Sequence, residues 1–380
     1  MINKIQILPE FIANQIAAGE VVQRPESVVK ELVENSIDAG ADSIAVIVRD
    51  AGKSLIHIVD NGSGMTPEDL KISVKRHATS KIFKQEDLDA ILSFGFRGEA
   101  LASISSVAKI EIRTKTEESG ELGWKLIAEP GREIEMEPAA LDKGTQIFVR
   151  SLFYNVPARR KFLRANLTEF RHISNTMLRF ALAHPDISFT FYDEDNLVFD
   201  LKPESLESRI KKLFSEETSK SLIPVHYSDE EIEISGYIGE PHLARKTKAN
   251  QYFFLNKRAI SSRSLSHAVF TAMENFLDRA SHPFYIINFK LNPSTVDVNI
   301  HPQKHEVKFE DERYIYNLLL RTAADALSRQ NLMPEFEEEA GNDFFVDKNT
   351  GEMIKPVNIQ KETKSNFTSR LENEDFSANK

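Results

Sequence analysis

The stretch Glu31-Leu-Val-Glu-Asn35-Ser-Ile-Asp38-Ala-Gly40 lies in a segment with the pattern of an amphipathic helix. Pro25 suits the first turn, where its missing N–H is not needed, and Gly40 favours a stop. Apolar residues recur at helical spacing between them, and Glu31 and Asn35 share one face because they are four residues apart. A carboxylate that polarises water beside an amide oxygen that binds a hard cation would form a hydrolytic pair. A solvated acidic face explains the same pattern.

The composition is that of an ordinary globular protein. The 380 residues are enough for two or three domains, and 41% of them are hydrophobic and 28% charged. The chain has no apolar run near the roughly 18 residues that a membrane-spanning helix needs, so we expect no membrane partner. The net charge of −10 argues against a uniformly basic nucleic-acid-binding protein but is compatible with a local basic groove.

The chain has no cysteine. Disulfides, thiolate zinc sites and cysteine nucleophiles are therefore excluded, and the composition fits a reducing compartment. The first ten residues lack a basic segment followed by an apolar core, so we expect no secretory signal peptide. These features predict a cytoplasmic protein.

A second stretch, Asp60-Asn-Gly62-Ser-Gly64, follows a predicted strand at 55–59. Two glycines two residues apart allow the backbone to turn sharply and to approach a ligand closely. A carboxylate at the end of a buried strand can accept a hydrogen bond from an exocyclic amine. An Asp-Asn-Gly sequence is also ordinary turn chemistry, so both interpretations stay open for this stretch alone.

A third stretch, Gly95-Phe96-Arg97-Gly98-Glu99-Ala100-Leu101, has the composition of a glycine-hinged loop that leads into a helix. Unpaired N–H groups at a helix start attract phosphate, and Arg97 would add a positive charge there. The polar residues 77–92 before it predict a loop or a mobile lid. Glycine pairs of this spacing are common by chance, so this stretch alone is a weak signal.

The other segments alternate between helix and strand patterns. We predict helices at 11–22, 66–76, 155–164, 169–184, 206–214, 263–279 and 312–329, and strands at 44–48, 107–114, 122–128, 144–149, 187–192, 196–201, 231–238, 251–256, 284–291 and 295–300. A domain boundary is predicted at 202–206, and the acid-rich residues from Glu335 onward predict a disordered tail or linker. The predicted organisation is 1–204, 205–331 and 332–380.

Taken together and in this order, the three stretches resemble the ATP-binding motifs of the GHKL superfamily, which includes DNA gyrase, the Hsp90 chaperones, histidine kinases and MutL proteins. Four further stretches are similar to the MutL mismatch-repair family: Ala13-Asn-Gln-Ile-Ala-Ala-Gly-Glu20-Val-Val22, Arg76-His-Ala-Thr-Ser-Lys81-Ile82, Phe153-Tyr-Asn-Val-Pro157-Ala-Arg-Arg-Lys-Phe-Leu163 and Val298-Asn-Ile-His-Pro-Gln-Lys304-His-Glu-Val307. The resemblance covers about residues 1–330, and runs of this length are highly specific.

The resemblance implies both a fold and a function. The first domain would be a GHKL (Bergerat) α/β sandwich with helices on one face of a mixed sheet, and the second an α+β domain like domain 2 of ribosomal protein S5. The protein would be a DNA mismatch-repair ATPase that binds and hydrolyses ATP with Mg²⁺. ATP-dependent lid ordering and N-terminal dimerisation would act as a switch or clamp on DNA that couples mismatch recognition to downstream repair enzymes.

The resemblance also implies residue roles. Glu31 corresponds to the general base, Asn35 to the Mg²⁺ ligand and Lys304 to a lysine that reaches the γ-phosphate. Asp60 corresponds to the carboxylate that recognises the adenine amino group, with Thr145 as its hydroxyl partner. The other expected nucleotide-binding residues are Asp38, Gly62 and Gly64, then Thr79, Ser80 and Lys81 in the lid, and Gly95, Phe96, Arg97, Gly98, Glu99, Ala100 and Leu101 around the phosphates.

The expected partners follow from the same resemblance. They are a mismatch-recognition protein of the MutS type, a downstream repair nuclease or helicase, a second copy of the chain when ATP is bound, and DNA of the nucleoid. DNA would be bound through its backbone by a basic groove, for which the candidates are Arg159, Arg160, Lys161, Arg164, Lys257, Arg258 and Arg263, with Arg245, Lys246 and Lys248 beside them. Any one of these residues is equally compatible with merely solubilising a helix start or turn.

The sequence departs from the family pattern after the acidic tail. MutL proteins normally continue to a C-terminal dimerisation domain, which in many members is a metal-dependent endonuclease, and nothing here resembles it. We therefore expect an N-terminal fragment without endonuclease activity. An alternative to the ATPase switch is a DNA clamp in which ATP turnover is incidental. A topoisomerase subunit, a chaperone or a histidine kinase would need additional segments that the sequence does not show.

Overall fold

The structure is a computed structural model, and it describes residues 10–81, 98–278, 280–297, 307–330, 345–346 and 353–354. Residues 1–331 form one compact unit and residues 332–380 a second. In the second unit, strand β16 (Phe345–Val346) pairs with β17 (Met353–Ile354). The rest of the predicted disordered tail lies outside the described residues.

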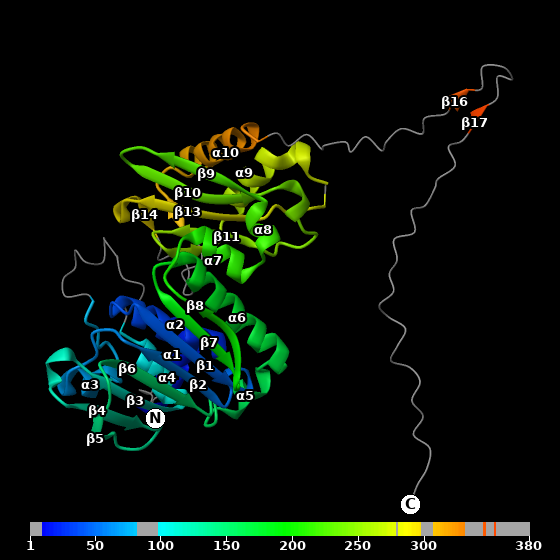
Figure 1. The fold of residues 1–380 in the computed structure, drawn as a ribbon. Coiled ribbons are helices and arrows are strands. Elements are labelled where there is room, and N and C mark those ends of the chain that lie inside the picture. Colours follow the sequence, from blue (N-terminus) through cyan, green and yellow to red (C-terminus); the bar gives the residue numbers. More distant parts are fainter. Residues whose placement is uncertain are drawn as a thin grey trace, which may run out of the picture. The chain divides into compact units, whose positions relative to one another are not determined.

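An eight-stranded mixed sheet forms the first half of the larger unit (Figure 1). Its strand order is β5-β4-β3-β6-β2-β1-β7-β8, and every neighbouring pair is antiparallel except β1 with β7. The strands are β1 (Ser43–Arg49), β2 (Leu55–Asp60), β3 (Lys109–Lys115), β4 (Leu122–Ala128), β5 (Glu135–Ala140), β6 (Gly144–Arg150), β7 (Ser188–Asp193) and β8 (Asn196–Leu201). Strand β2 is a central strand, so its last residue, Asp60, is far from both edge strands of the sheet.

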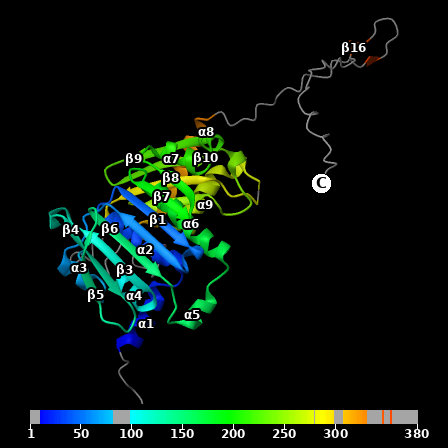
Figure 2. The same ribbon diagram turned by 60° about the horizontal axis from the view of Figure 1, so that its bottom comes forward.

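Helices pack against one face of this sheet (Figure 2). Side chains from α2, α4 and α6 join those of the central strands in a single buried cluster, whereas alternate residues on the strands' other face stay partly exposed. The helices of this half are α1 (Glu10–Val21), α2 (Pro25–Asp38), α3 (Pro67–Ser73), α4 (Ala100–Val107), α5 (Pro157–Phe162) and α6 (Asn166–Ala183). Helices on one face of a mixed sheet are the architecture that the resemblance implies for the first domain.

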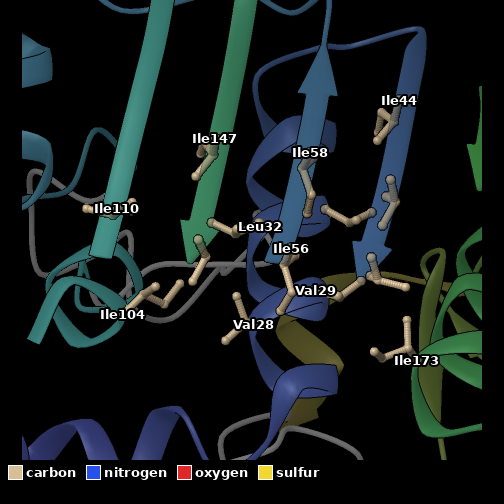
Figure 3. Close-up of a cluster of buried hydrophobic side chains, with 14 of the residues drawn as sticks. Val28, Val29, Leu32, Ile44, Ile56, Ile58, Ile104, Ile110, Ile147 and Ile173 are labelled. Carbon is tan, nitrogen blue, oxygen red and sulfur yellow. The ribbon is translucent and has the colours of Figure 1, made fainter. Parts of the chain in front are cut away.

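Helix α2 begins with Pro25 in its first turn and ends before Gly40, whose φ is +73°. Its apolar side chains point at the sheet, where Val28, Val29 and Leu32 meet isoleucines of the neighbouring strands (Figure 3). Fully burying each such side chain contributes roughly 1.5–3 kcal/mol, so this face fixes the rotation of the helix. The more polar face, with Glu31 and Asn35, is consequently left partly exposed.

A five-stranded mixed sheet forms the second half. Its order is β12-β11-β13-β10-β9, and only β11 and β13 are parallel neighbours. The strands are β9 (Leu222–Ser228), β10 (Ile232–Gly239), β11 (Gln251–Leu255), β12 (Arg258–Ile260) and β13 (Tyr285–Leu291), with the short pair β14 (Val296–Asp297) and β15 (Lys308–Phe309) beside them. The helices are α7 (Leu206–Leu213), α8 (Glu216–Lys220), α9 (Arg263–Met273) and α10 (Glu312–Ser328), of which α9 and α10 pack together.

Arg209 on α7 links the end of the first sheet to the start of the second half. Its side chain is fully buried and donates hydrogen bonds to four carbonyl oxygens, those of Ala181, Pro185, Ile187 and Lys202. The carboxylate of Glu204 pairs with it at 3.0 Å. A buried arginine needs this many partners, because an unpaired buried charge is strongly destabilising. This network therefore fixes the chain around the predicted boundary at 204.

The predictions for the central elements are confirmed, and several edge elements were missed. The strands β5, β9, β12 and β15 and the helix α8 were not predicted, nor were β16 and β17 in the tail that was predicted to be disordered. Of the strand predicted at 295–300, the structure describes β14 (Val296–Asp297), and residues 298–300 lie outside the described residues. Helix α3 ends at Ser73 rather than at Arg76, and α9 ends at Met273 rather than at residue 279. Over the described ranges, no helix is both long and apolar enough to cross a membrane.

Candidate functional site

Asp60 is a buried carboxylate at the end of β2. It has the same parity as Ile56 and Ile58, so its side chain points towards the helix layer. One of its oxygens accepts a hydrogen bond from the Ser36 hydroxyl of α2 at 2.8 Å, and the other accepts from the Gly62 N–H at 3.0 Å. The Ser36 bond attaches the strand end directly to the helix that carries Glu31, and the Gly62 bond stabilises the turn that follows.

Burial raises the pKa of the Asp60 carboxyl, and hydrogen bonds from the Ser36 hydroxyl and the N–H groups of Gly62 and Thr145 partly offset this shift. The residue is 8% exposed. A carboxylate held in so little water is costly unless it has a specific partner, which makes Asp60 a candidate ligand-binding group.

Two threonines continue the polar row across the sheet. Thr145 on β6 pairs in register with Asp60 on one side and with Thr114 of β3 on the other. The two threonine hydroxyls are 3.1 Å apart, and the Thr114 hydroxyl also accepts a hydrogen bond from the Met65 N–H at 2.9 Å. These three side chains thus join strands β2, β6 and β3 at one end of the core. The Met65 bond also ties them to the turn at 60–64, which we call the glycine turn.

The glycine turn lies against the end of α2. A Cβ on Gly62 would come within 2.9 Å of the Ala39 side chain and carbonyl oxygen, and the Ser63 N–H donates to the same carbonyl. Gly64 has a φ of +71°, and a Cβ there would overlap the Lys115 carbonyl. Gly62 therefore allows the turn to approach the end of α2, and Gly64 allows it to approach the end of β3.

We expect Gly64→Ala to lower the free energy of unfolding by roughly 1–3 kcal/mol, because it adds backbone strain and a clash with Lys115. Gly120→Ala is the matched control, since Gly120 has a φ of +67° and no atom within 4 Å of the added Cβ. Urea unfolding of both variants separates the two contributions. Equal losses would show that the approach to Lys115 is unimportant.

On the polar face of α2, Asn35 and Asp38 share one partner. The Lys81 ammonium lies 3.0 Å from the Asn35 side-chain oxygen and 2.5 Å from an Asp38 carboxylate oxygen. Glu31 lies one turn earlier, with its side chain 24% exposed and a carboxylate oxygen 4.0 Å from the Lys30 ammonium. Glu31 is therefore accessible and Asn35 is already engaged with a cation.

The segment around Lys81 meets the start of α4. The Lys81 N–H donates to the Thr79 hydroxyl at 3.2 Å, and Ser80 between them is exposed. Gly98 has a φ of +60°, and a Cβ there would come within 2.5 Å of the Ala78 carbonyl oxygen. Glu99 precedes α4, whose first residues are Ala100 and Leu101. Gly95, Phe96, Arg97 and Lys304 lie outside the described residues.

The basic candidates fall into two groups. Seven form an exposed group, namely Arg160, Lys161 and Arg164 around α5, Arg245, Lys246 and Lys248 before β11, and Arg263 at the start of α9. The other three are engaged within the chain: Arg159 donates to the Gln15 carbonyl of α1 at 3.0 Å, Lys257 pairs with Asp186 at 3.0 Å, and Arg258 is partly buried.

Arg258 comes from the second sheet but lies near α2. Burial lowers the pKa of its guanidinium. The opposing effect comes from three carboxylates on α2, those of Glu34, Asp38 and Glu31. Arg258 therefore belongs to the electrostatic surroundings of the polar face of α2.

Sequence reasoning missed two residues of this site, Ser36 and Thr114. Ser36 stands inside the Glu31–Gly40 motif and falls on the buried face, so the helical pattern was an available signal. Thr114 has no local signal, because its place depends on the pairing of β3 with β6.

Two families match the chain. Residues 23–136 match the family described as "Histidine kinase-, DNA gyrase B-, and HSP90-like ATPase", and residues 210–328 match "DNA mismatch repair protein, C-terminal domain". A solved structure titled "Crystal Structure of N terminal domain of a DNA repair protein" aligns with a TM-score of 0.73 and 27% identity, covering 84% of this chain and 99% of that one. The Aquifex aeolicus MutL ATPase domain complexed with ADP aligns with a TM-score of 0.57 and 26% identity over 79% and 98%.

The fold and the first family match define a GHKL-type ATPase domain. Curated relatives narrow the class. The DNA mismatch repair protein MutL of Flavobacterium psychrophilum is 45% identical over 343 residues, which are 90% of this chain and 56% of that protein. MutL of Christiangramia forsetii is 45% identical over 365 residues, 96% and 58% of the two chains. The chain belongs to the MutL family of DNA mismatch-repair proteins, and it spans about half the length of these relatives.

Proposed function

We propose that this chain binds ATP beside Asp60 and hydrolyses it, using the nucleotide as a switch in DNA mismatch repair. The observation that carries the proposal is the bond between Asp60 and Ser36, which joins a buried carboxylate to the helix that holds Glu31. A carboxylate that recognises a base and a carboxylate that activates water would then face one ligand. The ADP-bound MutL relative supports a nucleotide as that ligand.

In this proposal Asp60 accepts a hydrogen bond from the adenine amino group, and Thr145, its register partner on β6, provides the hydroxyl beside it. Glu31 orients a water molecule and accepts its proton, a contribution typically of ~10²–10⁴-fold. Phosphoryl transfer otherwise depends on positioning and on neutralising charge. The helix start at Ala100 supplies N–H groups, and Lys304 is proposed to supply the charge next to the γ-phosphate.

The residues present fit a bound Mg²⁺. Asn35 and Asp38 offer oxygen atoms, which hard cations prefer, and these two oxygens already hold the cationic end of Lys81. Asn35 would ligate the ion, which when bound neutralises phosphate charge. No group of three or more acidic or histidine side chains suited to a metal occurs in the described part of the chain, so the triphosphate would supply further ligands.

The switch is proposed to work through dimerisation. We expect sedimentation velocity to show dimers with Mg²⁺ and a non-hydrolysable ATP analogue, and monomers without nucleotide. The reason is the proposed ordering of the 77–97 lid by nucleotide, although residues 82–97 lie outside the described residues. Asp60→Asn provides the control, since it should stay monomeric with the analogue. A wild-type chain that stays monomeric with bound analogue would contradict this part of the proposal.

DNA binding is proposed for the exposed basic residues at α5. The side chain of Phe162 there is 87% exposed, between the charges of Lys161 and Arg164. We expect affinity for duplex DNA to fall steeply between ~50 and ~200 mM salt, and Arg160→Ala/Lys161→Ala to reduce the logarithmic slope by about 2, one for each lost phosphate contact.

The control for DNA binding is Lys71→Ala/Lys75→Ala, which removes two exposed lysines at α3. Fluorescence anisotropy at several salt concentrations measures the DNA affinity of the wild type and of both double variants. A flat salt dependence, or equal slopes for the wild type and the α5 variant, would contradict binding at this surface.

The remaining parts of the proposal follow from family membership. They are partners of the MutS type and a downstream nuclease or helicase, and residence in the cytoplasm at the nucleoid. The domain boundary at 204/205 is proposed from the stretch Lys202-Pro-Glu-Ser205 between the two sheets. We also propose that these 380 residues have no endonuclease activity of their own.

A further inference from the structure

The Lys81 ammonium is bonded to the two α2 side-chain oxygens to which the divalent cation is proposed to bind. It lies between the Asn35 oxygen at 3.0 Å and the Asp38 carboxylate at 2.5 Å. The two side chains of the Lys81–Asp38 ion pair are largely shielded from solvent, with exposed fractions of 19% for Lys81 and 10% for Asp38. A compact positive charge on two oxygens from adjacent turns of one helix is what a hard cation would also supply.

The two cations compete for the same oxygens. A carboxylate that is largely shielded from water needs a counter-charge, and Lys81 supplies one to Asp38. Placing a divalent ion beside the same oxygens would put two cations within a few ångströms of each other, where repulsion in a partly buried site is strong. Lys81 must therefore leave before the oxygens can bind a metal ion.

We propose that Lys81 is a built-in competitor for the divalent cation, holding Asn35 and Asp38 until metal and nucleotide displace it. This inference rests on the proposed ATP function and deepens it, because binding of the cation to α2 would be the event that releases Lys81. The displacement would move a segment with contacts of its own: Thr79 bonds to the Lys81 N–H, and the next contact along the chain is between Ala78 and Gly98. Cation binding would thus change the contact between Ala78 and Gly98 at the start of α4.

Direct metal binding tests the proposal without relying on turnover. Mn²⁺ is titrated into the nucleotide-free chain and followed by electron paramagnetic resonance, with wild type compared with Lys81→Met. We expect the variant to bind Mn²⁺ on the order of tenfold more tightly, because a competing unit charge has gone. Lys75→Met, which removes an exposed lysine six residues earlier, should leave the affinity unchanged.

A second readout distinguishes competition from a merely structural ion pair. Lys81→Met leaves Asp38 without its lysine, so the variant should melt at a lower temperature and regain stability on addition of Mn²⁺. The double variant Lys81→Met/Asp38→Asn should lose both the tight Mn²⁺ binding and the rescue. If Lys81→Met does not fold, Lys81→Gln replaces it in the test. This variant keeps a donor for Asp38 but no charge, and it should also bind Mn²⁺ more tightly than the wild type.

Unchanged or weaker Mn²⁺ binding by the uncharged variants would overturn the proposal. That failure is distinct from a failure of the ATP function. If the wild type binds ATP in an Asp60-dependent manner while Lys81 variants leave Mn²⁺ affinity unchanged, only the competitor role is wrong. If Mn²⁺ binding tightens but no nucleotide binds, the ATP function is wrong.

Discussion

Asp60→Asn is expected to weaken ATP binding by about 100-fold or more, because it replaces an ionised acceptor with a neutral amide that carries a donor. The fold should survive, since burial raises the pKa of Asp60 and the charged form is costly to keep there. The amide nitrogen can donate to Ser36, whose hydroxyl also reaches the Leu32 carbonyl at 3.2 Å. Isothermal titration calorimetry measures the loss of ATP affinity, and thermal unfolding measures whether the fold survives.

The same carboxylate predicts a pH dependence for nucleotide binding. Protonation removes the acceptor, so affinity should be constant above the raised pKa of Asp60 and fall as the pH is lowered through it. The sign for stability is opposite. The folded state holds this proton more tightly than the unfolded chain, so this group's contribution to stability decreases as the pH rises from the ordinary pKa to the raised one.

Asp193→Asn is the matched control. Asp193 also ends a strand of the same sheet, and burial also raises the pKa of its carboxyl, but it lies at the end of β7, away from the glycine turn. It should leave ATP affinity unchanged. Equal losses in the two variants, or full binding by Asp60→Asn, would show that Asp60 does not recognise the base.

Glu31→Ala should bind ATP with nearly wild-type affinity and hydrolyse it ~10²–10⁴-fold more slowly, because only the water-activating carboxylate is lost. The side chain is partly exposed, and among the described residues its carboxylate has only the 4.0 Å contact with Lys30, so stability should change by less than about 1 kcal/mol. Steady-state phosphate release and nucleotide binding measure the two steps. Glu31→Gln keeps the shape without the base and should behave like Glu31→Ala.

Glu68→Ala, which removes an exposed acid on α3, serves as the control and should hydrolyse ATP at the wild-type rate. Near-normal turnover by Glu31→Ala would remove Glu31 from the mechanism. Glu31→Ala also distinguishes the two functional hypotheses, since ATP-induced dimers and stimulation of repair partners that persist in this variant would favour a clamp in which turnover is incidental.

Local rules predicted the elements that carry the site. Helix α2 follows from its proline start, apolar spacing and glycine stop, and the start of α3 follows from Thr66, whose side chain caps the Asp69 N–H. The strand that ends at Asp60 follows from its alternation, which also sets the direction of the carboxylate. These features lie within a few residues of one another, so the sequence alone contains them.

The edge strands could not be predicted in the same way. Strand β5 contains Pro138, and β9 contains Pro224, and proline argues against a strand in any sequence reading. Both lie at the edge of a sheet, where a missing N–H is tolerated because no further strand needs it. Their pairing with β4 and β10 decides the conformation, and pairing is a property of the tertiary fold.

Charge alone also left the partners of the basic residues undetermined. Arg159 was a DNA candidate because it stands among other bases, but its guanidinium lies against Gly19 and bonds to α1. Arg258 stood in a basic stretch as well, but it lies among the carboxylates of α2. Such pairings join residues more than a hundred positions apart, and the pattern of a single sequence does not show them.

The crystal structure of the chain with Mg²⁺ and a non-hydrolysable ATP analogue tests the central claim most directly. We predict one nucleotide, with its adenine amino group about 3 Å from an Asp60 oxygen and its γ-phosphate facing Glu31 across a water molecule. A nucleotide bound elsewhere, or one whose adenine makes no contact with Asp60, would contradict the account.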